Sequence, residues 1–131
     1  MFVLDASVAA SWAFPDEAGS STSSALQVLA TDGAIVPALF WFELRNILVV
    51  NERRGRIREA ETRSFLRNLA ILPIQVDTLI DEDEVMRMAR TYQLTVYDAA
   101  YLELASSRKL PLATLDRQLQ RASALERVRK L

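Results

Sequence analysis

Short aliphatic runs that alternate with longer stretches of helical periodicity constrain the fold of this chain more than any other feature. Such alternation is typical of βαβ units built around a parallel sheet. The first four runs are apolar nearly throughout, as expected of strands that are covered on both faces. The expected strands are residues 2–4, 34–36, 74–76, 112–114 and, more weakly, 128–131.

Glycine, proline and serine mark the boundaries of the helices between these strands. Gly55 favours a helix end, and Pro37, Pro73 and Pro111 lie at strand edges, where a missing N–H is tolerated. The serine-rich segment 19–24 predicts a loop that leads into a helix N-cap. The expected helices are residues 8–14, 24–31, 39–54, 58–69, 82–92, 99–108 and 117–124.

Length and composition indicate one globular domain. We expect that domain to span residues 1–131. The 16 basic and 17 acidic residues give a net charge of -1, which favours neither a nucleic-acid binder nor an acidic tail. Cysteine is absent, which excludes disulfides and fits a reducing compartment. With no signal peptide and no apolar run of membrane-spanning length, the sequence predicts a cytoplasmic protein.

Histidine is also absent, and this excludes the largest number of enzyme classes. Serine–histidine triads and histidine-based RNA cleavage both need an imidazole that titrates near neutral pH. Carboxylates are the acid–base and ligand groups that remain. Any enzymatic site in this chain should therefore be built from Asp and Glu.

Two aspartates follow predicted strands directly. Asp5 comes after the first strand and Asp116 just after the fourth. Parallel open sheets bind their ligands outside the carboxyl ends of the strands, so both acids should lie at one edge of the sheet. Each also precedes a predicted helix, and the structural alternative is a helix N-cap.

Two further acids stand out by their surroundings. Asp98 lies at the start of a strongly apolar helix, where it could equally complement the helix N-terminus. Glu43 interrupts an apolar run, and a carboxylate there is costly unless it is paired or bound to a metal. Arg45 and Arg63 are its candidate ion-pair partners. If the four acids converge, their repulsion calls for a cation, and an all-oxygen site suits Mg²⁺ or Mn²⁺ rather than zinc.

Four ordered motifs together resemble the PIN-domain family and, more narrowly, the VapC toxins of toxin–antitoxin pairs. Each motif alone is weak, but their order and spacing extend over nearly the whole chain. They are Leu4-Asp5-Ala6-Ser7-Val8, Phe42-Glu43-Leu44-Arg45-Asn46, Val96-Tyr97-Asp98-Ala99-Ala100-Tyr101-Leu102 and Ala113-Thr114-Leu115-Asp116-Arg117-Gln118-Leu119.

The resemblance implies a three-layer α/β/α sandwich with a central parallel sheet and a Mg²⁺- or Mn²⁺-dependent endoribonuclease that cleaves RNA. It also implies inhibition by a cognate VapB-like antitoxin. The four positions that carry the family's acidic metal ligands are all acidic in this chain. Asp5 and Asp98 are expected to bind the metal directly. Ser7 and Thr114 match its accessory hydroxyls. The acidic positions are Asp5, Glu43, Asp98 and Asp116.

Basic and aromatic residues raise two questions about binding. Seven arginines between positions 45 and 67 could grip RNA phosphates, although a solvated face interleaved with glutamates is the simpler interpretation. Tyr97 and Tyr101 could stack a base, although a core role is favoured. The consecutive Phe40, Trp41 and Phe42 exceed one core-facing stripe, which predicts either a homodimer or antitoxin surface or a deeply buried helix.

Other classes of protein fit the sequence less well. Aspartyl-phosphate phosphatases need a second aspartate where this chain has Ser7, and phospho-receiver domains need a lysine after a late strand, where neither Lys109 nor Lys130 lies. The alternative that stays open is a catalytically inactive PIN-like module that binds RNA or protein. The presence of all four acids favours the nuclease.

Overall fold

A four-stranded parallel sheet forms the centre of the molecule in the computed structural model, which describes all 131 residues. The strand order is β3-β2-β1-β4, so the first strand of the chain is flanked by the second and the last. Val3 pairs with Ile35 of β2 on one side and with Leu112 of β4 on the other. The strands are β1 (Phe2–Leu4), β2 (Ala34–Pro37), β3 (Ile74–Asp77) and β4 (Leu112–Ala113).

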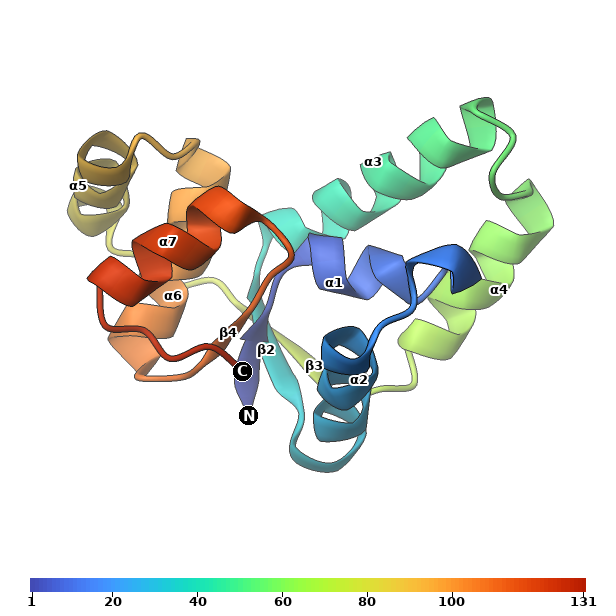
Figure 1. Cartoon of the computed structure of the whole chain (residues 1–131), viewed down its shortest axis with the longest axis horizontal. Helices are drawn as coiled ribbons and strands as arrows, with labels where there is room; N and C mark the ends of the chain where they lie inside the picture. Colours follow the sequence, from blue (N-terminus) through green and yellow to red (C-terminus); the bar gives the residue numbers. More distant parts are fainter.

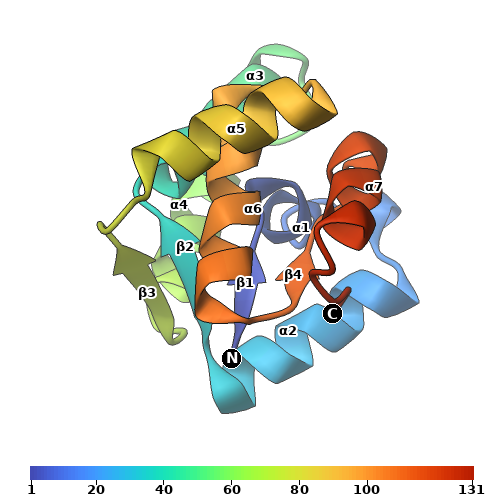
Figure 2. The same ribbon diagram turned by 90° about the vertical axis from the view of Figure 1, so that its left-hand side faces the viewer.

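Helices cover both faces of the sheet and complete three layers. Figure 1 shows α5, α6 and α7 on one side and α1 to α4 on the other, and Figure 2 views the sheet from the α6 side. The predicted three-layer α/β/α sandwich is therefore confirmed. The helices are α1 (Ala6–Ser11), α2 (Ser20–Asp32), α3 (Leu39–Arg53), α4 (Glu59–Leu69), α5 (Glu82–Tyr92), α6 (Val96–Arg108) and α7 (Arg117–Leu125), with a 3-10 turn η1 (Pro15–Glu17).

The core explains why the strands are so apolar. Phe2, Val3 and Leu4 are fully buried, because β1 has neighbours on both sides and helices on both faces. Helix α6 is buried along most of its length, from Ala99 to Ala105, because it packs against the sheet and contacts both α5 and α7. A helix covered in this way is apolar around most of its circumference.

Two strand predictions need correction. The prediction that both faces of the strand are covered was wrong for β3. This strand lies at the edge of the sheet and exposes Gln75 and Val76. The weak strand at 128–131 was also wrong, because only an isolated bridge joins Lys130 to Leu112. An edge position leaves one side of a strand without a neighbour, so side chains there need not be covered.

The helix predictions fail mainly at the helix starts. Helix α1 spans Ala6–Ser11 rather than 8–14, because the chain turns directly from β1 through the extended Asp5 and then enters η1 at Pro15. Helix α2 begins at Ser20, so residues 20–24 of the predicted loop 19–24 are helical and only Gly19 is extended. Its first turn is held by Thr22, whose hydroxyl accepts the Gly19 N–H at 3.2 Å. Helix α6 begins at Val96 rather than 99.

No helix of the chain is both long enough and apolar enough to span a membrane.

Gly33, between α2 and β2, is the residue whose replacement we expect to disturb the fold. Its backbone has φ 80° and ψ 171°, and an added Cβ would lie 3.1 Å from the Pro73 carbonyl oxygen. Gly33→Ala should lower the free energy of unfolding by about 1–3 kcal/mol, measured by urea denaturation. Gly19→Ala is the matched control, because Gly19 is extended and has room for a Cβ. Equal losses from both variants would contradict this account.

Candidate active site

Asp5 is the most deeply placed of the four acids that the motifs single out. It follows β1 directly and precedes α1, so its carboxylate lies at the carboxyl edge of the central strand. Its side chain is buried but forms no capping bond to α1, which removes the N-cap interpretation for this residue. A buried carboxylate that is not a cap needs another stabilising partner.

Two hydroxyls supply part of that stabilisation. Ser7 Oγ donates to Asp5 Oδ2 at 2.7 Å, and Thr114 Oγ1 donates to the same oxygen at 2.6 Å. Each hydroxyl also accepts a backbone N–H, from Leu115 at 3.1 Å and from Asp116 at 3.1 Å respectively. The end of β1 is thereby joined to the segment between β4 and α7, which carries Asp116.

Asp98 and Asp116 are presented by the first turns of α6 and α7. Thr95 is the N-cap of α6, and its hydroxyl accepts the Asp98 N–H at 3.1 Å, so Asp98 is not itself the cap. Asp116 is the N-cap of α7, and its Oδ1 accepts the Leu119 N–H at 2.8 Å. The N-cap interpretation therefore holds for Asp116. Its other carboxylate oxygen, Oδ2, accepts no backbone N–H.

Glu43 reaches the site from α3 and is fixed by a tyrosine on α6. The Tyr101 hydroxyl donates to Glu43 Oε1 at 2.7 Å. The ion pairs considered for Glu43 do not form, because Arg45 stacks on the Trp41 ring and Arg63 pairs with Glu59. Glu43 thus remains half-buried with no basic partner.

The four acids are close enough to repel one another. Burial raises the pKa of Asp5, and the negative charge of Asp116 raises it further against the two hydroxyl bonds. Burial likewise raises the pKa of Asp98, with additional increases from Asp5 and Asp116. Burial also raises the pKa of Glu43; the Tyr101 bond opposes this, while Asp5 and Asp98 add to it. Asp5 is thus electrostatically coupled to all three other acids.

The donor set fits a hard divalent cation. It consists of carboxylate and hydroxyl oxygens with no nitrogen or sulfur ligand, which suits Mg²⁺ or Mn²⁺ and not zinc. No three acidic side chains lie close enough together to hold one ion directly. This arrangement still fits Mg²⁺, because protein sites for this ion often use one or two carboxylates and keep several waters.

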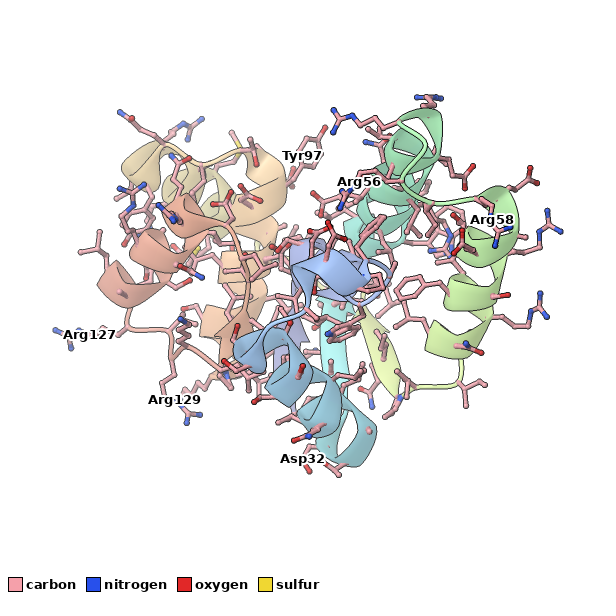
Figure 3. The ribbon with its side chains drawn as sticks, turned by 45° about the vertical axis from the view of Figure 1, so that its right-hand side comes forward. Asp32, Arg56, Arg58, Tyr97, Arg127 and Arg129 are labelled. Carbon is pink, nitrogen blue, oxygen red and sulfur yellow. The ribbon has the colours of Figure 1, made fainter.

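The role of Tyr101 was missed from the sequence. We expected a core residue; the ring is indeed fully buried, yet its hydroxyl holds Glu43. Tyr101 follows Asp98 by three positions, so both lie on one face of α6, and that spacing was the available signal. Tyr97, for which a core role was also favoured, is 61% exposed and points into the gap between α6 and α3 (Figure 3).

Three of the seven arginines of the α3–α4 hairpin, Arg56, Arg58 and Arg63, pair with acidic neighbours. Arg56 pairs with Asp16 and Glu17 of η1, both at 3.1 Å. Arg58, the N-cap residue of α4, pairs with Glu61 in the first turn of that helix (Figure 3). These pairs favour the solvated face over a phosphate-binding patch for these arginines.

The aromatic residues of α3 divide between core and solvent. Phe40 is buried, whereas Trp41 is 53% and Phe42 70% exposed, with their rings 5.1 Å apart. The alternative of a deeply buried helix is therefore wrong. The partner surface stays a prediction.

Comparisons with known proteins agree with this fold. The family described as PIN domain matches residues 2–125, so the chain belongs to the PIN domain family. Ribonuclease VapC3 of Pyrobaculum aerophilum is 33% identical over 124 residues, which cover 89% of this chain and 90% of that protein. The crystal structure of PAE2754 from the same organism has a TM-score of 0.73 at 28% identity, covering 92% of this chain and 83% of that chain. The predicted family is confirmed.

Neutralising Asp5 should stabilise the metal-free protein near neutral pH. The pKa of Asp5 is higher in the folded protein than its ordinary value of 3.8, which applies to the unfolded chain. Ionised Asp5 therefore disfavours folding once the pH exceeds 3.8. In EDTA, Asp5→Asn should therefore unfold at a higher urea concentration than the parent at pH 7.5. The difference should shrink as the pH falls toward about 4, where both proteins carry a neutral group. A gain that is the same at both pH values would contradict this explanation.

Removing the Tyr101 hydroxyl should shift the titration of Glu43. Tyr101→Phe loses the bond that lowers the pKa of Glu43, so that pKa should rise further, as followed by carboxylate NMR. The variant should also lose about 1 kcal/mol of stability. Tyr92→Phe is the matched control, because the Tyr92 hydroxyl donates to Glu126 at 2.8 Å, outside the site. The interpretation fails if the Glu43 titration is unchanged in Tyr101→Phe.

Proposed function

We propose that this protein is a metal-dependent endoribonuclease of the VapC type that hydrolyses RNA phosphodiester bonds. The observation that carries the proposal is the electrostatic coupling of Asp5, Glu43 and Asp98, reinforced by Asp116, at the carboxyl edge of the sheet. These acids come from separate elements, and the pKa values of Asp5, Glu43 and Asp98 are raised, as expected of a site assembled to receive a cation. The similarity to a protein named Ribonuclease VapC3 supports RNA as the substrate.

Asp5 and Asp98 are the residues we assign to direct binding of Mg²⁺ or Mn²⁺. Asp116 and Glu43 complete the site directly or through water, and one of them orients the attacking water. When bound, the divalent ion activates water and neutralises charge on the phosphate. Because water is the nucleophile, the ribose 2′-hydroxyl takes no part, and the products carry a 5′-phosphate and a 3′-hydroxyl.

The neighbouring residues keep these acids in place. The Ser7 and Thr114 hydroxyls both donate to one oxygen of Asp5, which fixes the rotation of that carboxylate. Tyr101 does the same for Glu43 across the gap between α6 and α3. Acids held in this way need little reorganisation when substrate binds, and such preorganisation lowers the barrier to reaction.

Partner proteins are a further part of the proposal. Trp41 and Phe42 leave a large aromatic surface on α3 open to solvent. Surfaces of this kind commonly bind another protein, and we propose that a second copy of this chain or a VapB-like antitoxin covers it. Its position directly before Glu43 in α3 places such a partner beside the acids.

The decisive experiment is RNA cleavage by the purified protein, freed of any bound partner. Total cellular RNA incubated with Mg²⁺ or Mn²⁺ should yield discrete fragments that bear 5′-phosphates. EDTA should abolish cleavage, and Asp98→Asn should lower the rate by at least about a hundredfold, because it removes a ligand charge from the site. Equal cleavage by Asp98→Asn and the parent would overturn the assignment of the site.

Two controls separate loss of activity from loss of structure. Asp32→Asn removes the same charge from the exposed end of α2 and should leave cleavage unchanged. Mg²⁺ should raise the melting temperature of the parent with the logarithm of its excess over Kd, and raise that of Asp98→Asn less. No cleavage together with a flat response to metal would favour the inactive RNA- or protein-binding module.

A further inference from the structure

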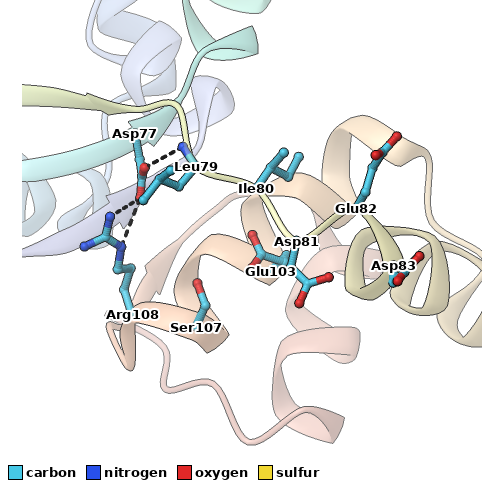
Figure 4. Close-up of a pocket in the computed structure, with 9 residues that line it drawn as sticks. All are labelled: Asp77, Leu79, Ile80, Asp81, Glu82, Asp83, Glu103, Ser107 and Arg108. Atoms are coloured by element: carbon cyan, nitrogen blue, oxygen red, sulfur yellow. Dashed lines mark hydrogen bonds and ion pairs between the residues drawn. The ribbon is translucent and has the colours of Figure 1, made fainter.

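A second group of acidic side chains lies away from the candidate active site, where β3 ends and α5 begins. It lines a hollow of about 670 Å³, which we name the α5 hollow. None of the four acids of the candidate active site contributes to it. Five carboxylates and a single basic side chain line it (Figure 4): Asp77, Asp81, Glu82, Asp83 and Glu103, with Arg108.

Two of these carboxylates have structural roles that account for them. Asp77 accepts from Arg108 Nε at 2.9 Å and from the Leu79 N–H at 2.9 Å. Asp81 is the N-cap of α5 and accepts the Glu84 N–H at 3.1 Å. Acids at a helix N-terminus are favourable by themselves. Neither residue therefore requires a ligand.

Glu103 is different, because no structural role accounts for its charge. It lies on α6, is only 5% exposed and forms no ion pair, and the donors beside its carboxylate, the Ser107 hydroxyl and the Asp81 N–H, are both neutral. The Ser107 hydroxyl is shared with the Leu104 carbonyl, to which it donates at 3.3 Å. In Figure 4 the Glu103 carboxylate points toward the loop between Asp77 and Asp81, and no interaction is drawn to it.

The surroundings of Glu103 call for a positive charge. Burial raises its pKa, hydrogen bonds from the Ser107 hydroxyl and the Asp81 N–H oppose this in part, and the charges of Asp81 and Asp77 add to it. The only basic side chain in the hollow, Arg108, is already bound to Asp77. A largely buried carboxylate without a basic partner is costly, and a cation placed against it would reduce that cost.

The rim of the α5 hollow is apolar. Leu79 and Ile80 are 76% and 56% exposed and line it directly. They also line an adjoining shallow pocket, whose other walls include Leu39 at the start of α3 and Leu104 of α6. The acidic floor and the aliphatic rim together match a long side chain that has a positively charged head and an apolar stem.

These features select one kind of ligand. The net negative charge of the hollow would repel RNA phosphates. A bare metal ion is disfavoured, because no three acidic side chains are close enough to hold one. We propose that the α5 hollow binds an arginine side chain of a partner protein, with its guanidinium against Glu103 and flanking aliphatic residues on Leu79 and Ile80. Arginine fits better than lysine, because its planar group pairs with a carboxylate through two bonds.

The proposal is independent of catalysis, although the hollow and the candidate active site share an element. Helix α6 carries both Glu103 and Asp98. A partner anchored in the α5 hollow would therefore rest against the helix that presents an acid of the candidate active site.

NMR titration of the ¹⁵N-labelled full chain in EDTA tests the proposal. The probe is the capped peptide Leu-Arg-Leu, and the matched control peptide is Leu-Gln-Leu. The arginine peptide should shift amides in residues 77–83 and 103–108, and the glutamine peptide should not.

Glu103→Gln should weaken binding of the arginine peptide about tenfold, because it removes a charge-assisted bond. Asp81→Asn retains a residue able to cap α5 and should also weaken binding. Asp32→Asn, which removes a distant exposed charge (Figure 3), should not.

Several outcomes would overturn the proposal. Equal shifts from both peptides would show that charge is irrelevant, and unchanged binding by Glu103→Gln would remove the assigned anchor. Shifts centred on Asp98 and Asp116 would place the arginine at the other acidic site. In a separate titration without EDTA, MgCl₂ could shift the amides of residues 77–83 with an affinity equal to that of the arginine peptide. That result would make the hollow a metal site instead.

Discussion

The site depends on one buried carboxylate, that of Asp5, which the fold places at the carboxyl edge of the central strand. Both hydroxyl bonds to Oδ2 come from residues that also hold the backbone between β4 and α7. The interaction therefore serves two purposes at once. It stabilises an acid that burial disfavours, and it sets the position from which Asp116 enters the site.

Around this carboxylate the molecule tolerates a concentration of like charge. The cost is visible in the raised pKa values of Asp5, Glu43 and Asp98, and part of it is offset by bonds from Tyr101 and the hydroxyls. A protein selected for stability alone would gain by replacing one of these acids with an amide. Their joint retention in a member of the PIN domain family fits a site built for a cation.

Sequence patterns predicted the four strands of the sheet and the positions of Asp5 and Asp116 just after two of them, because both depend on local signals. A buried parallel strand is apolar throughout, and an acid directly after it can only lie at the carboxyl edge. Helix starts were less predictable, because Thr95 and Thr22 fix them through hydrogen bonds that compete with other turn conformations. The Glu43–Tyr101 hydrogen bond and the lack of a basic partner for Glu103 depend on distances between elements. No local sequence pattern contains these distances.

The position of β4 has a consequence for the order in which the protein gains its site. This strand is added last along the chain, yet it lies beside the first, and Thr114 and Asp116 follow it directly. A nascent chain that has not yet released its final segment holds Asp5 without Thr114 and without the acid that completes the cluster. The protein therefore passes through a form without the complete cluster, and the assembled cluster first exists when the segment that carries Thr114 and Asp116 has joined the sheet beside β1.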